Sequence, residues 1–344
     1  MNWVRGETVG HGSFGKVSLA VAGSGPPSVV VKSCGASSVG SLLNEKVVLD
    51  ELQGCPEIVH CLGDGYTFEN GERVYNVLLE FASLGALSEN LKSSENRRFQ
   101  EGEIRRYSRA LLRGLKFIHR AGFVHCDIKL QNVLLCGDGR VKIADFGLAK
   151  RAGERSSGCE LRGTPMYMSP EMVKGGEQGA PADVWALGCA VVEMSSGAPA
   201  WKYSDVAGLF MRIGVGDEVP GFPGELSDQG RDFLEKCFIK DPIKRWTAEM
   251  LLNHPFVAAD HRDGGGTVAL SKEYSPSAPS PSPRCPFDFP DWVSEEESPL
   301  AAPPAAYFPS PGSEHSPASR LQGMFSHKFF PNWAPDPDGW VNVR

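Results

Sequence analysis

The apolar residues in the first 80 positions fall into short runs separated by Gly and Pro turns. VSLAVA (17–22), PSVVVKS (27–33) and YNVLLEFA (75–82) are rich in β-branched residues, which predicts strands. Between the second and third runs, SLLNEKVVLDEL (41–52) spaces its leucines as one face of a helix does. The pattern therefore predicts a β-rich N-terminal lobe that contains one helix.

From about residue 84 onward the apolar pattern becomes helical. In EGEIRRYSRALLRGLKFIHRAG (101–122) one apolar face is formed by Ile104, Tyr107, Leu111, Leu115 and Ile118. ADVWALGCAVVEMSSG (182–197) is apolar nearly all round, which indicates a helix buried on every side. We therefore expect an α+β, bilobal fold: a small antiparallel β lobe with one helix and a larger, mostly helical lobe, with a cleft between them.

The composition changes sharply near residue 260. The stretch 263–344 holds 15 of the 26 prolines of the chain, in segments such as SPSAPSPSPRCP and acidic SEEES. Such a segment buries too little apolar surface to offset its ordering entropy, so a mostly disordered tail is predicted. Two aromatic islands, CPFDFPDW (285–292) and FSHKFFPNW (325–333), interrupt it and are typical of docking segments.

Charge and cysteine content exclude several classes of function. The chain has 344 residues, a formal net charge of −7 and no basic stripe, which argues against nucleic acid as a main partner. Its nine cysteines are odd in number and lack metal-ligand spacing, so we expect reduced thiols and a reducing compartment. We see no targeting or membrane segment. The expected location is the cytoplasm, with nuclear entry left open.

A glycine-rich loop and a lysine suggest that the N-terminal lobe binds phosphates. GHGSFGKV (10–17) lies between strand-like segments, and its missing Cβ atoms would let backbone N–H groups approach phosphates. Alone, such a loop is more often an ordinary hairpin. VVVK then ends in Lys32, a cation one strand later, and Glu45 on the predicted helix is a candidate ion-pair partner.

The second half of the chain supplies acids at a characteristic spacing. In HCDIKLQN (125–132), Asp127 can accept a hydroxyl proton, Lys129 can stabilise a transferring phosphoryl group, and Asn132 can hold a metal ion. In VKIADFG, Asp145 is placed at a strand end before a Gly turn, which suits Mg²⁺ binding. GTPMYMSPE (163–171) follows, and coincidence becomes very unlikely when all these segments occur in this order.

On these motifs the chain resembles the eukaryotic protein-kinase family. The resemblance implies a kinase domain over residues 3–256, with an N-lobe (3–79), a hinge (80–84) and a C-lobe (85–256), followed by a regulatory tail (257–344). It implies ATP and Mg²⁺ as cofactors. Asp127 is then the catalytic base, assisted by Lys129, Lys32 and Glu45, while Asn132 and Asp145 hold the metal.

The resemblance also implies which residues surround ATP. The glycine loop contributes Val9, Gly10, His11, Gly12, Ser13, Phe14, Gly15, Lys16 and Val17. The purine pocket contributes Val30, Leu79, Glu80, Ala82 and Leu134, and Lys32 reaches the phosphates. Structural roles are implied as well. Glu171 should form an ion pair with Arg245. Asp183 should support the catalytic loop, residues 125–132, through hydrogen bonds.

The acceptor class follows from Lys129 and Thr164, which match the serine/threonine pattern of the family. Within it, GHGSFGKV, HCDIKLQN and GTPMYMSPEM resemble plant MEKK-like MAP kinase kinase kinases. This resemblance implies a MAP kinase kinase as protein substrate, in a cascade that carries stress or hormone signals. The Ser-Pro sites of the tail (275, 280, 282, 298, 310 and 316) are candidate targets of a downstream MAP kinase.

Two residues depart from the family pattern. Cys126 replaces the arginine that in many kinases pairs with an activation-loop phosphate, and a neutral thiol cannot make that contact. We therefore expect activity largely independent of activation-loop phosphorylation; if that loop is a target at all, Ser156 and Ser157 are the candidates. Val30 replaces the usual alanine, and its extra methyl groups should weaken ATP binding by about 1 kcal/mol.

Three alternatives stay open from the sequence. The chain could be a kinase-fold scaffold with little catalysis, or a serine/threonine kinase with substrates outside the cascade. An aromatic island of the tail could also fold back and restrain the kinase lobes. Truncation near residue 262 tests that restraint.

Overall fold

A computed structural model of the chain describes residues 3–12, 15–21, 28–35, 38–154, 161–175 and 177–258. The predictions for Ser13 and Phe14, for Ser156 and Ser157, and for nearly all of the tail fall outside these residues. Within them, no helix combines the length and apolar character that a membrane span requires.

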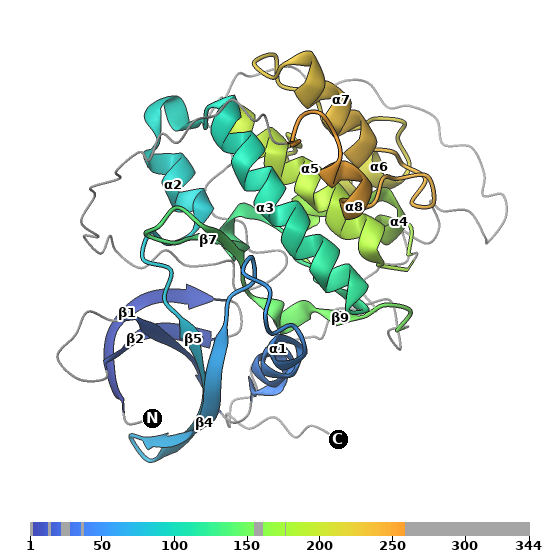
Figure 1. Cartoon of the computed structure of the whole chain (residues 1–344). Helices are drawn as coiled ribbons and strands as arrows, with labels where there is room; N and C mark the ends of the chain where they lie inside the picture. Colours follow the sequence, from blue (N-terminus) through green and yellow to red (C-terminus); the bar gives the residue numbers. More distant parts are fainter. Residues whose placement is uncertain are drawn as a thin grey trace, which may run out of the picture. The chain divides into compact units, whose positions relative to one another are not determined.

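The N-terminal part of the chain forms one antiparallel sheet with a helix beside it (Figure 1). Its strands are β1 (Val4–Gly12), β2 (Gly15–Val21), β3 (Val29–Gly35), β4 (Cys61–Glu69) and β5 (Glu72–Glu80), in the order β1-β2-β3-β5-β4, and its helix is α1 (Gly40–Glu51). The three predicted strands and the predicted helix are all present. Because β3 is the central strand, with β2 on one side and β5 on the other, its Lys32 is buried.

The remainder is mostly helical, which confirms the bilobal α+β prediction. The helices are α2 (Leu87–Ser93), α3 (Glu101–Arg120), α4 (Pro170–Val173), α5 (Ala180–Ser196), α6 (Val206–Gly214), α7 (Asp228–Cys237) and α8 (Ala248–Leu252). Two short antiparallel pairs, β6 (Phe123–Val124) with β9 (Lys150–Arg151) and β7 (Val133–Leu135) with β8 (Val141–Ile143), interrupt them. Of these four strands only β8, which ends just before Asp145, was predicted; the others have two or three residues, too few to show an alternating pattern.

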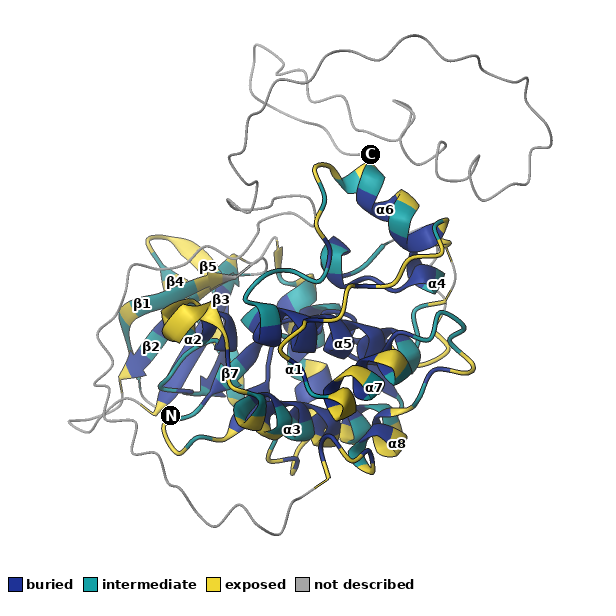
Figure 2. Ribbon diagram, turned by 90° about the horizontal axis from the view of Figure 1, so that it is seen from above, coloured by how far each residue is buried: buried dark blue, intermediate teal, exposed yellow. Residues whose placement is uncertain are grey.

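Helices α3 and α5 form the core of the larger lobe, as their patterns predicted. All five apolar residues of the expected α3 face are buried. Residues 182–195 of α5 are buried without exception, and Figure 2 shows α5 dark blue while α7 and α8 carry exposed positions. α5 ends at Gly197, where φ is +72° and an added Cβ would lie 2.4 Å from Arg97 O, so only glycine fits.

The packed domain extends slightly further than the sequence suggested. Val257 is fully buried, and its carbonyl oxygen accepts a hydrogen bond from the Arg109 side chain on α3. The sequence pattern assigns Val257 to the tail, because the apolar periodicity fades there. The burial shows that the folded domain includes it.

A buried carboxyl group on α5 makes stability depend on pH. Glu193 accepts a hydrogen bond from the Tyr167 hydroxyl, and its side chain lies in the protein interior. Burial raises the pKa of Glu193 to about 7, because the hydrogen bond from Tyr167 only partly offsets the loss of solvation. The folded protein therefore binds this proton more tightly than the unfolded chain does.

The stabilisation that comes from this proton is complete below pH 4.5 and is lost as the pH rises to 7. We expect wild-type protein to lose about 2.5 kcal/mol of unfolding free energy through Glu193 between pH 5 and pH 8. Glu193→Gln should remove that loss, since a neutral amide still accepts from Tyr167. Urea unfolding at both pH values checks this, with exposed Glu235→Gln as the control. Parallel pH dependence in wild type and Glu193→Gln would contradict it.

Candidate active site

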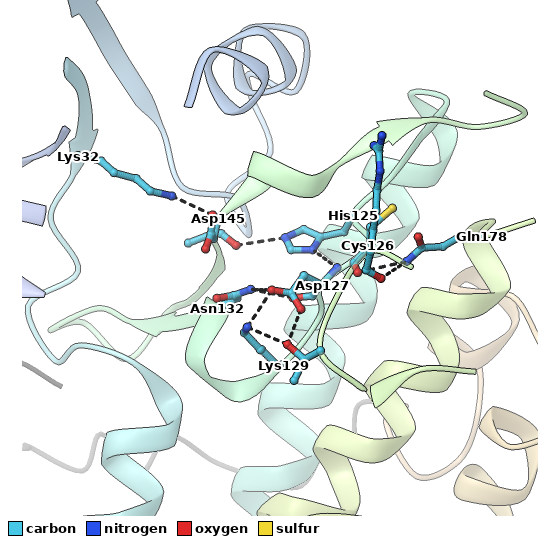
Figure 3. Close-up of polar contacts among 11 residues, drawn as sticks. Lys32, His125, Cys126, Asp127, Lys129, Asn132, Asp145 and Gln178 are labelled. Atoms are coloured by element: carbon cyan, nitrogen blue, oxygen red, sulfur yellow. Dashed lines mark hydrogen bonds and ion pairs between the residues drawn. The ribbon is translucent and has the colours of Figure 1, made fainter. Parts of the chain in front are cut away.

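Lys32 binds two carboxylates, one in its own lobe and one in the larger lobe. Its Nζ lies 2.6 Å from Glu45 Oε2 on α1 and 2.8 Å from Asp145 Oδ1, which follows β8. The predicted Lys32–Glu45 pair is thus present, and Figure 3 shows Lys32 extending toward Asp145. Burial alone lowers the pKa of Lys32, but the charges of Asp145 and Glu45 outweigh it and raise the pKa above its ordinary value. The lysine therefore stays an ammonium ion.

Asp145 is held in an uncommon backbone conformation. Its φ is +64°, in the left-handed region, which aspartate tolerates better than most residues. Burial alone would raise the pKa of Asp145, but the charge and hydrogen bond of Lys32 hold it below its usual value. The side chain is therefore ionised at neutral pH.

Asn44, next to Glu45 on α1, ties this helix to the segment after Asp145. Its Nδ2 lies 2.8 Å from Ala149 O, 3.2 Å from Gly147 O and 3.4 Å from Phe146 O. One amide group thus contacts three backbone carbonyl oxygens within residues 146–149. The ion pair and this amide fix α1 relative to Asp145.

Asp127, Lys129 and Asn132 converge in the catalytic loop. Asn132 Nδ2 donates to Asp127 Oδ2 at 2.9 Å and to Asp127 O at 2.8 Å, and Lys129 Nζ lies 2.9 Å from Asp127 Oδ2. Thr164 donates to Asp127 Oδ1 at 2.8 Å and accepts from Lys129 at 2.9 Å. This confirms the expectation that Thr164 contacts both residues. The carboxylate of Asp127 is held from three sides and keeps lone pairs for a substrate hydroxyl.

Asp183, in the first turn of α5, braces this loop from behind. Its carboxylate accepts the backbone N–H of His125 at 2.9 Å and that of Cys126 at 3.0 Å, and it lies 2.9 Å from His119 Nε2. Burial alone would raise the pKa of Asp183, but these hydrogen bonds and the nearby histidines hold it below the usual value. The predicted bracing is confirmed.

His125 connects the catalytic loop to the metal-binding aspartate expected at 145. The backbone N–H of Asp127 donates to His125 Nδ1 at 3.2 Å, so Nδ1 is the acceptor nitrogen. The other nitrogen, Nε2, then carries the proton and donates to Ala144 O at 3.1 Å. The ring is fully buried and packs edge-on against Phe146. His125 thereby sets the spacing between Asp127 and Asp145.

The end of the segment after Asp145 is anchored by a second ion pair. Arg245 binds Glu171 through two hydrogen bonds of 2.7 and 2.9 Å, as predicted. The arginine also donates to Pro181 O at 2.7 Å and Ile239 O at 2.8 Å. Because its side chain is completely buried, this bidentate pair ties residue 171 firmly to α5.

The residues expected around the purine lie on β3, β5 and β7. Val30 and Leu79 are register partners in adjacent strands, and both are buried. Ala82 is buried too, and its backbone N–H makes no hydrogen bond with any described residue. Leu134 on β7 is half-buried. Ala82 therefore offers a donor to a ligand.

Glu80 points its side chain away from such a ligand. Its Oε1 lies 2.6 Å from Nζ of buried Lys142 on β8 and 2.8 Å from the backbone nitrogen of His60. The carboxylate therefore links the end of β5 to the strand that leads to Asp145. Any contact of Glu80 with adenine would come from its backbone.

The glycine loop is formed by the ends of β1 and β2. At Gly15 an added Cβ would lie 2.5 Å from Ser33 O, so strand packing already requires glycine there. A Cβ added at Gly10 would have no atom within 4 Å. Gly12 on β1 is the register partner of Gly15 on β2. The remaining loop positions expected at ATP are half-buried Val9 and Val17 and exposed His11 and Lys16.

The oxygens near Asp145 fit a magnesium ion. Asn132 donates a hydrogen bond through Nδ2 to Asp127 (Figure 3). The amide oxygen of Asn132, Oδ1, therefore faces away from Asp127. Lys32 engages Asp145 Oδ1, so Oδ2 takes no part in that bond. Carboxylate and amide oxygens are ligands that Mg²⁺ prefers. Among the described residues, no group of three or more His, Cys, Asp or Glu could hold a metal ion.

Sequence reasoning missed three residues of this site. His125 lies within the HCD motif, so its position was visible although its hydrogen bonds were not. Asn44 and Gln178 carried no signal, because each is a single amide whose partners are backbone carbonyls. A carbonyl contact leaves no trace in the identity of the partner residue.

Comparison with known proteins gives consistent matches. A model of the protein kinase domain matches residues 3–257. Mitogen-activated protein kinase kinase kinase 20 of Arabidopsis thaliana is 48% identical over 355 aligned positions, covering 100% of both chains. Mitogen-activated protein kinase kinase kinase 18 of the same plant is 39% identical over 267 positions, covering 75% of this chain and 78% of its own. The similarity to the first relative continues past residue 257.

Proposed function

Since this chain belongs to the protein kinase family and is a serine/threonine kinase, we propose that it phosphorylates a MAP kinase kinase. The proposal is supported by the relatives, which carry the name MAP kinase kinase kinase and match the chain over its whole length or three quarters of it. The pairing of Lys129 with Thr164 beside Asp127 supports a serine or threonine acceptor.

The reaction transfers the γ-phosphoryl group of ATP to a hydroxyl oxygen of the protein substrate. We assign to Asp127 the acceptance of the hydroxyl proton, since Asn132 and Lys129 orient its carboxylate. We assign to Lys32 the binding of the phosphates, because Glu45 and Asp145 hold its ammonium in place. When bound between Asn132 and Asp145, Mg²⁺ would neutralise charge on the phosphates.

The relative placement of Lys32, Asp145 and Asp127 supports the proposal of catalysis. The ion pairs of Lys32 bring the N-terminal lobe onto Asp145, while His125 fixes Asp145 relative to Asp127. A candidate base, a phosphate-binding cation and a candidate metal-binding carboxylate are therefore placed together. A kinase-fold scaffold with little catalysis would not need a base oriented beside these groups.

Purified protein incubated with ATP, Mg²⁺ and a panel of MAP kinase kinases tests the substrate. We expect phosphate on serine or threonine of at least one member, and loss of that signal when EDTA removes the metal. Autophosphorylation without any labelled member would point to substrates outside the cascade. Absence of both signals would point to a scaffold and overturn the proposal.

Phosphatase treatment tests whether activity is independent of activation-loop phosphorylation, as we expect from Cys126. The thiol is buried, and burial raises its pKa far above the usual value, so it carries no charge that could act on a phosphate. We expect treated and untreated enzyme to have the same activity within about twofold. A drop by orders of magnitude, reversed by rephosphorylation, would show that a phosphate orders the loop despite the missing arginine.

A further inference from the structure

The segment at residues 162–164 lies directly on the catalytic loop at Cys126. Gly163 has a φ of +104°, and an added Cβ would lie 2.4 Å from Cys126 O, so the two backbones touch. The next residue, Thr164, donates to Asp127. The position of this segment therefore controls a hydrogen bond to the catalytic carboxylate.

Gln178, in the loop between α4 and α5, contacts both sides of this junction. Its Nε2 lies 3.2 Å from Cys126 O and 3.4 Å from Arg162 O, and Figure 3 shows the amide directed at Cys126. Both partners are carbonyl oxygens, which only accept hydrogen bonds, so the amide nitrogen and not the amide oxygen must face them. An NH₂ group has two protons, one for each carbonyl.

The backbone at Cys126 needs such support. Cys126 has a φ of +70°, in the left-handed region that a residue with a Cβ adopts only at a cost. Asp183 holds the N–H of this residue, and Gln178 holds its carbonyl. The peptide units on both sides of Cys126 are therefore fixed by neighbours from α5 and from the loop that precedes it.

We propose that Gln178 is a positioning residue that docks residues 162–164 onto the catalytic loop through neutral hydrogen bonds. Because both bonds go to backbone carbonyls, the docking needs neither an arginine at position 126 nor a phosphate. Gln178 acts through Thr164, whose hydroxyl it helps to place against Asp127. The proposal rests on the kinase activity and not on the identity of the protein substrate.

The test compares Gln178→Glu and Gln178→Met with wild type, all treated with phosphatase. Glutamate has nearly the same shape but sets oxygens against two carbonyls, and methionine is neutral and has no donor. We expect kcat for a serine/threonine peptide to fall about tenfold in both variants. The KM for ATP should stay within twofold, because Lys32 and the purine residues do not contact Gln178. Amide hydrogens of residues 161–164 should exchange at least tenfold faster.

Gln229→Met, an exposed glutamine on α7, is the matched control and should behave as wild type. Unchanged kcat and unchanged exchange in both Gln178 variants would overturn the proposal. A lower melting temperature with unchanged kcat would overturn it too, since that is the result of a purely structural role. Hydrogen exchange needs no substrate, so it reports on Gln178 even if no MAP kinase kinase is phosphorylated.

Discussion

Asp127→Asn will bind ATP as the wild-type enzyme does and will transfer the phosphoryl group about 10²- to 10⁴-fold more slowly. An amide has nearly the same size as the carboxylate but cannot take up the hydroxyl proton. Lys129 and Asn132 remain in place, so the loop should keep its structure. Steady-state kcat with a serine/threonine substrate and ATP binding by calorimetry measure the two effects separately.

Asp217→Asn serves as the control, because Asp217 is an exposed aspartate away from the site. It should leave both quantities unchanged. If Asp127→Asn retained more than a tenth of the wild-type kcat while binding ATP normally, Asp127 would not be the base. A loss of ATP binding would instead show that Asp127 supports the nucleotide.

Lys32→Met will lower activity at least 10²-fold and will also destabilise the fold by about 3–5 kcal/mol. The methionine removes the cation that compensates two carboxylates, and Glu45 is only 1% exposed. The Oε1 atom of Glu45 already lacks a hydrogen-bond partner among the described residues, so the loss of Lys32 leaves the group without compensation. Kinase assays and urea unfolding of the same preparation measure both effects.

The double variant Lys32→Met/Glu45→Gln separates these effects. Because the glutamine carries no charge, roughly half of the lost unfolding free energy should return. Activity should not return, since no cation faces the phosphates. Recovery of activity along with stability would mean that Lys32 acts through folding alone.

The sequence predicted the parts of the fold that are long and periodic. α3 was predicted because apolar residues line one face of the helix over more than four turns. α5 was predicted because nearly all of its positions are apolar over a similar length. β1 and β4 were not among the predicted strands. Four of the nine positions in β4 are exposed, and glycines interrupt both strands. Val257 was assigned to the tail for a similar reason: a single buried residue at a domain edge has no periodic context.

Whether a residue of the candidate site could be predicted depends on the kind of group that it binds. Lys32, Glu45, Asp127 and Asp145 were predictable because their chemistry needs a charged side chain at a set spacing, and only a few residue types supply one. Asn44 and Gln178 were not, because what they bind is the polypeptide backbone. Any residue could have provided the carbonyl of Cys126 or Ala149, so only the folded geometry identifies these contacts.

The burial of Val257 decides where a shortened protein can end. A version cut at residue 256 would lose the carbonyl that Arg109 binds and would open a gap against α3. Reduced activity of such a fragment would then reflect damage to the catalytic domain, and it would hide any release of inhibition by the tail. Shortened proteins made to measure the influence of the tail should therefore retain Ala258.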